Sequence, residues 1–139
     1  MEYKRYNDTL VLRLDKGDEI ISSLAHVAEK ERIKTASFSG IGATDNFTVG
    51  IFSLEKQTYD GFSFTGNHEI TCLSGNITSV DGKPYIHAHI TCAGENANVV
   101  GGHLLEAKIS LTCEIFIDAV DGEVTRKRDE KLNINRFDF

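Results

Sequence analysis

Three of the five histidines fall in one short segment, PYIHAHITCAGENANVVGGHLL, which runs from residue 84 to residue 105. His87 and His89 are two residues apart, and side chains two apart in a β-strand point to the same face. Neutral imidazole is a common metal ligand in proteins. The HxH spacing therefore predicts that both rings can bind one ion. The alternative is that they are unrelated polar residues on a solvated strand face.

The third histidine, His103, comes close to this pair if the segment folds as a hairpin. With the turn centred on Asn96, His89 lies directly opposite His103, and such neighbours have Cβ atoms about 4.5–5.5 Å apart. Gly101 and Gly102 leave room for a bulge, which leaves the register open by one residue. Three neutral imidazoles with open water positions suit zinc, iron, nickel or copper. We expect a divalent transition metal at His87, His89 and His103, with zinc as the first choice.

Three acidic residues are candidates for supporting such a site: Glu69, Glu95 and Glu114. Each could be a fourth metal ligand, an acid–base partner, or a hydrogen-bond acceptor for an imidazole N–H. We interpret Glu95, in the hairpin turn, as a surface carboxylate, and Glu69 as the candidate catalytic residue. Cys92 points to the strand face opposite the histidines and is excluded from the site.

One helix is predicted between residues 18 and 32, where apolar residues recur at helical spacing. The stripe consists of Ile20, Ile21, Leu24, Val27 and Ala28. Asp15 is the expected N-cap, and His26 is expected to be solvated at the edge of the stripe. The helix must therefore pack one face against the rest of the domain.

The remaining chain predicts short strands separated by turns, of which Asp81-Gly82 is the clearest because it suits a type I′ hairpin. The expected strands cover residues 10–14, 33–43, 46–54, 57–66, 68–80, 84–92, 102–110 and 111–120. This pattern predicts an α+β fold in one domain, residues 1–139. Its largely antiparallel sheet would curl into a barrel or a split sandwich, with one main helix packed against it.

Composition limits the possible partners and locations. The net charge of −6 opposes binding to a phosphate backbone, and the only basic cluster, residues 126–131, is interrupted by two acidic residues. No apolar run of about 18 residues predicts a membrane span, and the charged N-terminus does not resemble a signal peptide. We expect a cytoplasmic protein in which Cys72, Cys92 and Cys113 are reduced, buried thiols.

Two known patterns are similar to the histidine segment. Gly82, His87, His89, Glu95 and Gly101 nearly follow the first cupin motif, but the second cupin motif is missing. The motifs HEITCLSGNI, HAHI, VVGGHLLEAKI and LTCEIFI, in that order, resemble the plant- and prokaryote-conserved (PPC, or PD1-like) domain, in particular its prokaryotic branch. The resemblance extends to LDKGDEIISSLAHVAEKERIKTASFSGIGAT and to the RKRDEKLN tail, and so covers nearly the whole chain.

The PPC resemblance implies an α+β fold with a strongly bent antiparallel sheet, assembly as a homotrimer, and a metal site at His87, His89 and His103. The family also carries a DNA-binding label from plant members that contain AT-hook segments. This chain has no Arg-Gly-Arg-Pro hook.

Three classes of function remain open. The first is a trimeric, metal-dependent module that binds a small molecule at subunit clefts or acts in regulation. The second is a metalloenzyme, a hydrolase or lyase, that uses a metal-bound water. The third is a DNA-associated protein, although the charge makes specific DNA binding by this chain unexpected.

Overall fold

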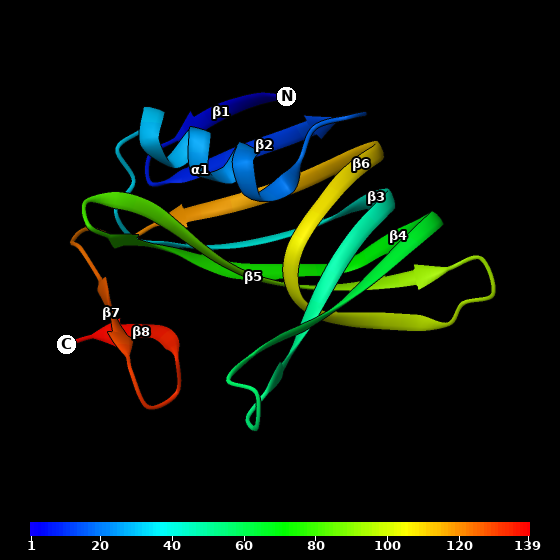
Figure 1. Ribbon diagram of the computed structural model, residues 1–139. Helices are drawn as coiled ribbons and strands as arrows, with labels where there is room; N and C mark the ends of the chain where they lie inside the picture. The colour runs from blue at the N-terminus through cyan, green and yellow to red at the C-terminus, as the bar shows by residue number, and fades with distance from the viewer.

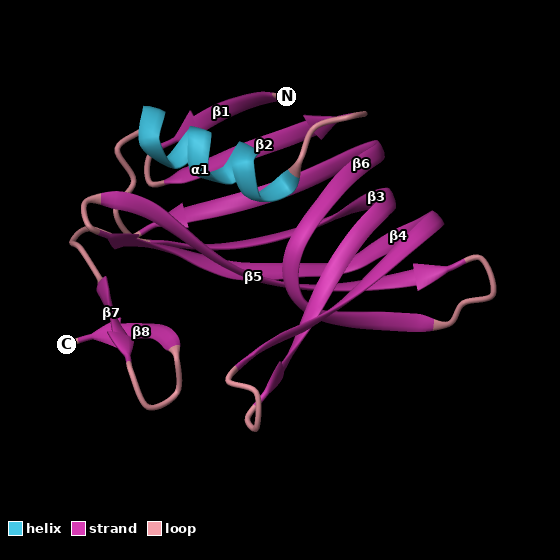
Figure 2. Cartoon of the chain, in the orientation of Figure 1, coloured by secondary structure: helices cyan, strands magenta, loops and turns pink.

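The computed structural model describes all 139 residues, which form eight strands and one helix (Figures 1 and 2). The elements are β1 (Glu2–Tyr6), β2 (Thr9–Asp15), α1 (Ile20–Lys30), β3 (Ala36–Ser53), β4 (Thr58–Val80), β5 (Lys83–Gly94), β6 (Val99–Ala119), β7 (Thr125–Asp129) and β8 (Ile134–Asp138).

The sheet is antiparallel almost throughout. Its order is β1-β2-β6-β3-β4-β7-β8, and β5 pairs with both β4 and β6. Strands β6, β3, β4 and β5 therefore make a ring that is only partly closed, so the fold is α+β with a strongly bent sheet and is not a barrel (Figure 1). The single parallel contact joins Ser79 of β4 to Thr125 of β7.

Three strands are much longer than the sequence predicted. Where a turn was expected between two short strands, the chain continues as one strand. Residues 33–43 and 46–54 were expected to be separate strands, but most of both belong to β3, and β4 and β6 merge expected strands in the same way. The pairing of β3 with β4 shifts register between Gly40 and Gly42 and again between Thr44 and Asn46. Bulges bend a strand without ending it, which explains how glycine and asparagine occur inside it.

Strands β1, β7 and β8 were not predicted. Each has five residues, and none of those residues is fully buried. A short strand without a buried face lacks the alternation of apolar and polar residues on which the prediction depends.

Helix α1 buries the predicted stripe, with Ile20, Leu24, Val27 and Ala28 inaccessible to solvent, while His26 is exposed as expected. The predicted N-cap was wrong. The cap is Glu19, whose carboxylate accepts hydrogen bonds from the backbone N–H groups of Ile21 and Ser22. Asp15 instead ends β2, and the helix starts later because Gly17 adopts a left-handed turn conformation (φ +93°) before it.

The hydrophobic core lies between α1 and the sheet. It contains 24 buried residues, drawn from α1, from β2, β3, β4, β5 and β6, and from the loop after α1, which contributes Ile33. On β5 the core residues are Ala88, Ile90 and Cys92. Because these alternate with the histidines, burying them against the helix turns His87 and His89 to the other face of the strand.

The expectation of three buried thiols was correct for two of them. Cys92 and Cys113 are buried, but Cys72 is exposed, and all three are free. A register shift between Ile70 and Cys72 places two residues, Thr71 and Cys72, outward between buried Ile70 and Leu73. Because of the same bulge, Leu73 is buried although Glu69 and Thr71, at the same two-residue spacing, are exposed.

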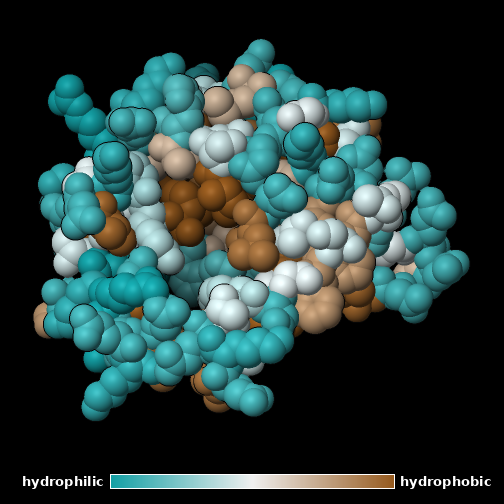
Figure 3. Space-filling model, in the orientation of Figure 1, coloured by the Kyte–Doolittle hydropathy of each residue, from teal (hydrophilic) through white to brown (hydrophobic).

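The surface is mostly hydrophilic in the view of Figure 3, with a hydrophobic patch near its centre, between α1 and β5. No helix has both the length and the apolar character required to cross a membrane.

Candidate metal centre

The hairpin of β4 and β5 positions the first two histidines. Its turn has positive φ angles at both Asp81 (51°) and Gly82 (75°), as a type I′ turn requires. The turn fixes the register in which Asn76 pairs with His87 and Ser74 pairs with His89. The predicted Asp-Gly turn is confirmed.

The hairpin of β5 and β6 brings in the third histidine. His89 pairs directly with His103, and the pairing runs without a shift from there to Ala93 and Val99. The register predicted with Asn96 at the turn centre is therefore confirmed, and Gly101 and Gly102 introduce no bulge between β5 and β6.

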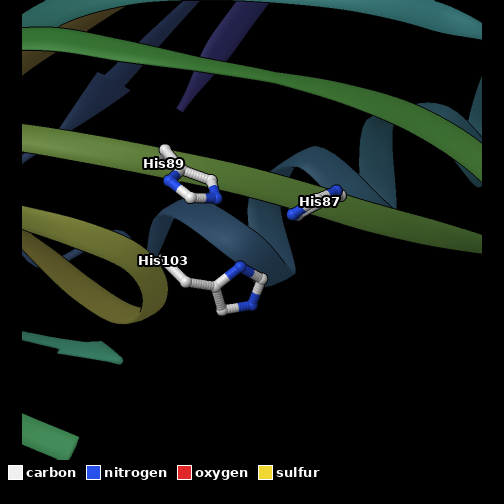
Figure 4. A group of neighbouring side chains, drawn as sticks. All are labelled: His87, His89 and His103. Atoms are coloured by element: carbon white, nitrogen blue, oxygen red, sulfur yellow. The ribbon is translucent and has the colours of Figure 1, made fainter. Parts of the chain in front are cut away.

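The three rings face one another (Figure 4). Their centroids are 5.4 Å apart for His87 and His89, 5.1 Å for His87 and His103, and 5.5 Å for His89 and His103. One ring nitrogen from each lies within 4.8 Å of the other two, so all three lie within about 2.8 Å of a common point. Zinc–nitrogen bonds are about 2.0–2.1 Å. Small side-chain rotations would therefore give all three ligand distances.

Burial favours the neutral form, which binds metals, for two of the three rings, His87 and His103. Burial, helped by the neighbouring rings of His87 and His89, lowers the pKa of His103 from 6.5 to about 4. Burial, the Arg126 charge and the His89 ring together lower the pKa of His87. Both rings are therefore neutral at pH 7, as a ligand imidazole must be.

One polar atom of this cluster, Nδ1 of His103, is buried and has no hydrogen-bond partner. A buried polar atom without a partner costs free energy, on the order of 1–3 kcal/mol. A metal ion held between the rings would satisfy it. The donor set, the distances and this unsatisfied nitrogen all fit a metal ion such as zinc.

The ring of Tyr59 covers His103. The two rings are stacked, with centroids 4.5 Å apart and planes 21° apart. Gly50, the register partner of His103, makes room for this stack, because a Cβ at Gly50 would lie 2.8 Å from Cδ1 of Tyr59. Tyr59 on β4 thus limits the rotation of the His103 ring.

Arg126 lies beside His87, another member of the cluster. This residue of β7 places Nη2 3.5 Å from Nδ1 of His87, which is too long for a strong hydrogen bond. Its Nε donates to Oγ1 of Thr78 (2.8 Å) and its Nη2 donates to Oδ1 of Asn76 (2.8 Å). The β7–β8 hairpin is thereby joined to the strand face that carries the histidines.

The acidic candidates lie elsewhere. Glu69 pairs with Ala93, four residues along β5 from His89, which is about 13 Å along a strand. It lines a separate surface pocket with His68 and Glu95. Glu114 is exposed and pairs with Arg13 of β2. None of the three joins the cluster of three histidines.

His26 and His68 are also separate from the cluster. His26 is on the exposed side of α1, and Nδ1 of His68 contacts the carbonyl oxygen of Gly66 at 2.8 Å. The sequence did not indicate Tyr59 or Arg126 as neighbours of the site. Arg126 was visible only as part of the basic cluster, and no spacing rule relates Tyr59 to His103.

The sequence matches the family model of the Plants and Prokaryotes Conserved (PCC) domain over residues 1–121. The chain belongs to this family, which is the PPC family of the sequence resemblance. Strands β7 and β8, and with them Arg126, lie beyond the matched residues. No curated protein gives a significant match to this PCC-domain chain.

Several solved structures share the whole fold. A "putative DNA binding protein" from Bacteroides thetaiotaomicron is 28% identical with a TM-score of 0.96, and the alignment covers 99% of this chain and 96% of that one. A plant- and prokaryote-conserved protein from Pyrococcus horikoshii is 30% identical (TM-score 0.89, covering 99% and 94%). A metal-containing protein from Archaeoglobus fulgidus is 31% identical (TM-score 0.88, covering 98% and 96%).

Proposed function

We propose that this PCC-domain protein binds one divalent transition metal ion per chain, with zinc the first choice, through His87, His89 and His103. We further propose that it acts as a trimeric module that binds a small molecule at this metal or has a regulatory role. The observation that carries the proposal is the convergence of three imidazole nitrogens within 4.8 Å of one another.

Two further observations support a metal at this position. Nδ1 of His103 is buried without any partner, and burial favours the neutral forms of His103 and His87. A relative of 31% identity that matches nearly the whole chain is described as a metal-containing protein. The identity of the metal in that protein is not part of its description, so zinc here rests on the preference of a three-imidazole set.

A three-histidine set leaves at least one coordination position for a ligand from solution. An ion held there would act as a Lewis acid toward an oxygen atom of that ligand. The residues of the chain would do the rest: Tyr59 restrains the His103 ring, and α1 holds the opposite face of β5 through Ala88 and Ile90.

The binding module is favoured over the metalloenzyme because no general base stands beside the histidines. None of the nine ion pairs of the chain includes one of the three histidines, so no carboxylate lies within 4.0 Å of their ring nitrogens. The closest acidic candidate along the strands, Glu69, is several residues away. A carboxylate beside the ion could act as a general base toward a metal-bound water, and these strands place none there.

Assembly as a homotrimer is part of the proposal. Large apolar side chains are exposed on the sheet, among them Ile41 (60%), Leu111 (73%) and Phe116 (52%). Ile41 pairs with Glu114 and Ser39 pairs with Phe116, so Ile41 and Phe116 share one face and lie close together. Exposed apolar groups of this kind mark protein–protein contacts. Light scattering should give three times the 15.4 kDa mass of one chain, and a stable monomer at micromolar concentration would refute the trimer.

Specific DNA binding is not proposed, despite the name given to the Bacteroides relative. The chain carries a net charge of −6, and Arg126 of its one basic cluster points toward the histidines and donates to Asn76. A sequence-dependent gel shift that survives physiological salt would overturn this expectation.

Metal analysis of the purified protein tests the central proposal. We expect close to one divalent transition metal per chain, and His87→Ala, His89→Ala and His103→Ala should each lose or weaken it. His26→Ala and His68→Ala are matched controls, because they remove an imidazole outside the cluster and should retain the metal. Full metal retention by the triple variant of the three cluster histidines would refute the site.

A further inference from the structure

Arg126 is held in an unusual way for a partly buried cation. Its three guanidinium nitrogens donate to neutral acceptors: Oγ1 of Thr78, Oδ1 of Asn76 and the carbonyl oxygen of Asn135, all at 2.8–2.9 Å. Its flat group also lies over two aromatic rings, 4.9 Å from the centroid of Tyr85 and 4.5 Å from that of Phe137. These contacts fix the position of the guanidinium on the strand face beside His87.

No carboxylate neutralises this charge. Arg126 takes part in none of the nine ion pairs of the chain, whereas Lys127, the next residue on β7, pairs with Asp138. Arg126 is half-buried, so part of the water around its guanidinium is lost. Keeping a partly desolvated cation without a counter-charge is costly. An anion that binds beside it would recover this cost.

The guanidinium also has donors left for a ligand. Of its five N–H groups, three are used by the contacts to Thr78, Asn76 and Asn135. Nη2 carries one of the two that remain, and this N–H is directed at Nδ1 of His87 over 3.5 Å. Because that contact is too long to be strong, the donor is only weakly engaged, and it lies beside the histidine cluster.

A metal ion bound at the histidine cluster would also need a negative charge to balance it, in the space beside Arg126. Imidazole ligands bring no negative charge to a divalent ion, and Arg126 adds one fixed cation beside it. The rings of Tyr85 and Phe137 lie against Arg126, and the ring of Tyr59 lies against His103. A small organic acid could bind the ion through oxygen and pair its carboxylate with this single guanidinium, while the aromatic rings suit its carbon skeleton. A phosphate group normally gathers several cationic or backbone donors.

We propose that the ligand of this site is a small organic carboxylate, which binds the metal ion through oxygen and places its carboxylate against the weakly engaged N–H donor of Arg126. This inference rests on the metal site proposed above and names the class of molecule that the site accepts. Arg126 then contributes recognition from outside the part of the chain that matches the family model, residues 1–121.

The test uses protein loaded with Co²⁺, whose visible absorption reports changes in the ligands of the metal. Pyruvate is the probe, pyruvamide is its uncharged analogue, and inorganic phosphate is the competing anion. We expect pyruvate to shift the spectrum with saturation and pyruvamide to bind much more weakly. Arg126→Met should retain Co²⁺ but weaken pyruvate binding about ten- to a hundredfold, as expected for loss of a hydrogen bond to a charged group.

Two further variants separate recognition from structural damage, since Arg126 also anchors the β7–β8 hairpin to β4. Lys127→Met removes the same charge from the same strand and should bind pyruvate like the unaltered protein. Arg126→Lys keeps the charge but loses the planar fork, and should recover part of the affinity.

The outcomes distinguish the two proposals. Failure of the unaltered protein to bind Co²⁺ would refute the metal site itself. A bound metal whose spectrum ignores pyruvate, or equal pyruvate affinity in the unaltered protein, Arg126→Met and Arg126→Lys, would refute the carboxylate inference alone. Tighter binding of phosphate with the same dependence on Arg126 would overturn the choice of carboxylate.

Discussion

Glu19 connects the helix to the sheet, and its removal should weaken both. Its Oε1 accepts from the backbone N–H of Ile21 (3.0 Å) and its Oε2 accepts from that of Ser22 (2.7 Å). Oε1 also accepts from the N–H of Ala107 on β6 at 3.3 Å. The backbone of Glu19 pairs with Lys108 as well. One carboxylate thus caps α1 and fastens its first turn to the strand that carries His103.

The magnitude follows from these contacts. Loss of a helix N-cap costs about 1 kcal/mol. Loss of a hydrogen bond from a partly buried N–H to a charged acceptor adds about 1 kcal/mol, since the contact to Ala107 is long. Glu19→Ala should therefore lower the free energy of unfolding by about 2 kcal/mol. Glu19→Gln, which keeps one acceptor oxygen, should lose roughly half as much.

Urea unfolding followed by circular dichroism measures this change. With a slope of about 2 kcal/mol per molar urea, Glu19→Ala should move the midpoint down by about 1 M. The control is Glu29→Ala, which makes the same change at an exposed residue of α1 that has no side-chain hydrogen bond or ion pair. The reasoning fails if Glu19→Ala costs no more than Glu29→Ala. It also fails if the amides of Ile21 and Ser22 exchange no faster in Glu19→Ala.

Three further outcomes are expected. Under native conditions only exposed Cys72 should react rapidly with a thiol reagent. Cys92 and Cys113 are buried, and burial raises the pKa of each thiol to about 12. Rapid reaction of all three cysteines would contradict this. Gly82→Ala should lower the melting temperature, because φ is +75° at this turn position and an alanine there should lower the free energy of unfolding by about 1 kcal/mol. An unchanged or higher melting temperature would count against the turn. A chelator should lower the melting temperature of metal-loaded protein but leave that of His103→Ala unaltered. A metal ion that binds only the folded state stabilises that state, and its removal reverses the effect. An equal fall in the melting temperature of both proteins would mean that the chelator acts elsewhere.

Local periodicity was enough to predict the centre of the site. Alternation along β5 placed His87 and His89 on one face, because Ala88 and Ile90 must be buried. The turn centred on Asn96 then set His103 opposite His89, as the structure confirms. The apolar stripe of α1 was predicted for the same reason, since each of these features depends only on residues close together in the chain.

Features that depend on contacts between distant segments could not be predicted. The bulge after Ile70 exposed Cys72. Backbone hydrogen bonds that join Gly17 and Asp18 to Ile109 of β6 hold these residues outside the helix, so that Glu19 is its cap.

The sequence by itself determined which side chains can share a face, because side chains repeat every two residues in a strand and about every 3.6 residues in a helix. Only the tertiary structure decided what surrounds the histidines. Arg126 is 39 residues from His87 along the chain, and Tyr59 reaches His103 only because the strands bend and Gly50 leaves space for its ring. The bend of a sheet results from the packing of all its strands, and no short stretch of sequence encodes it.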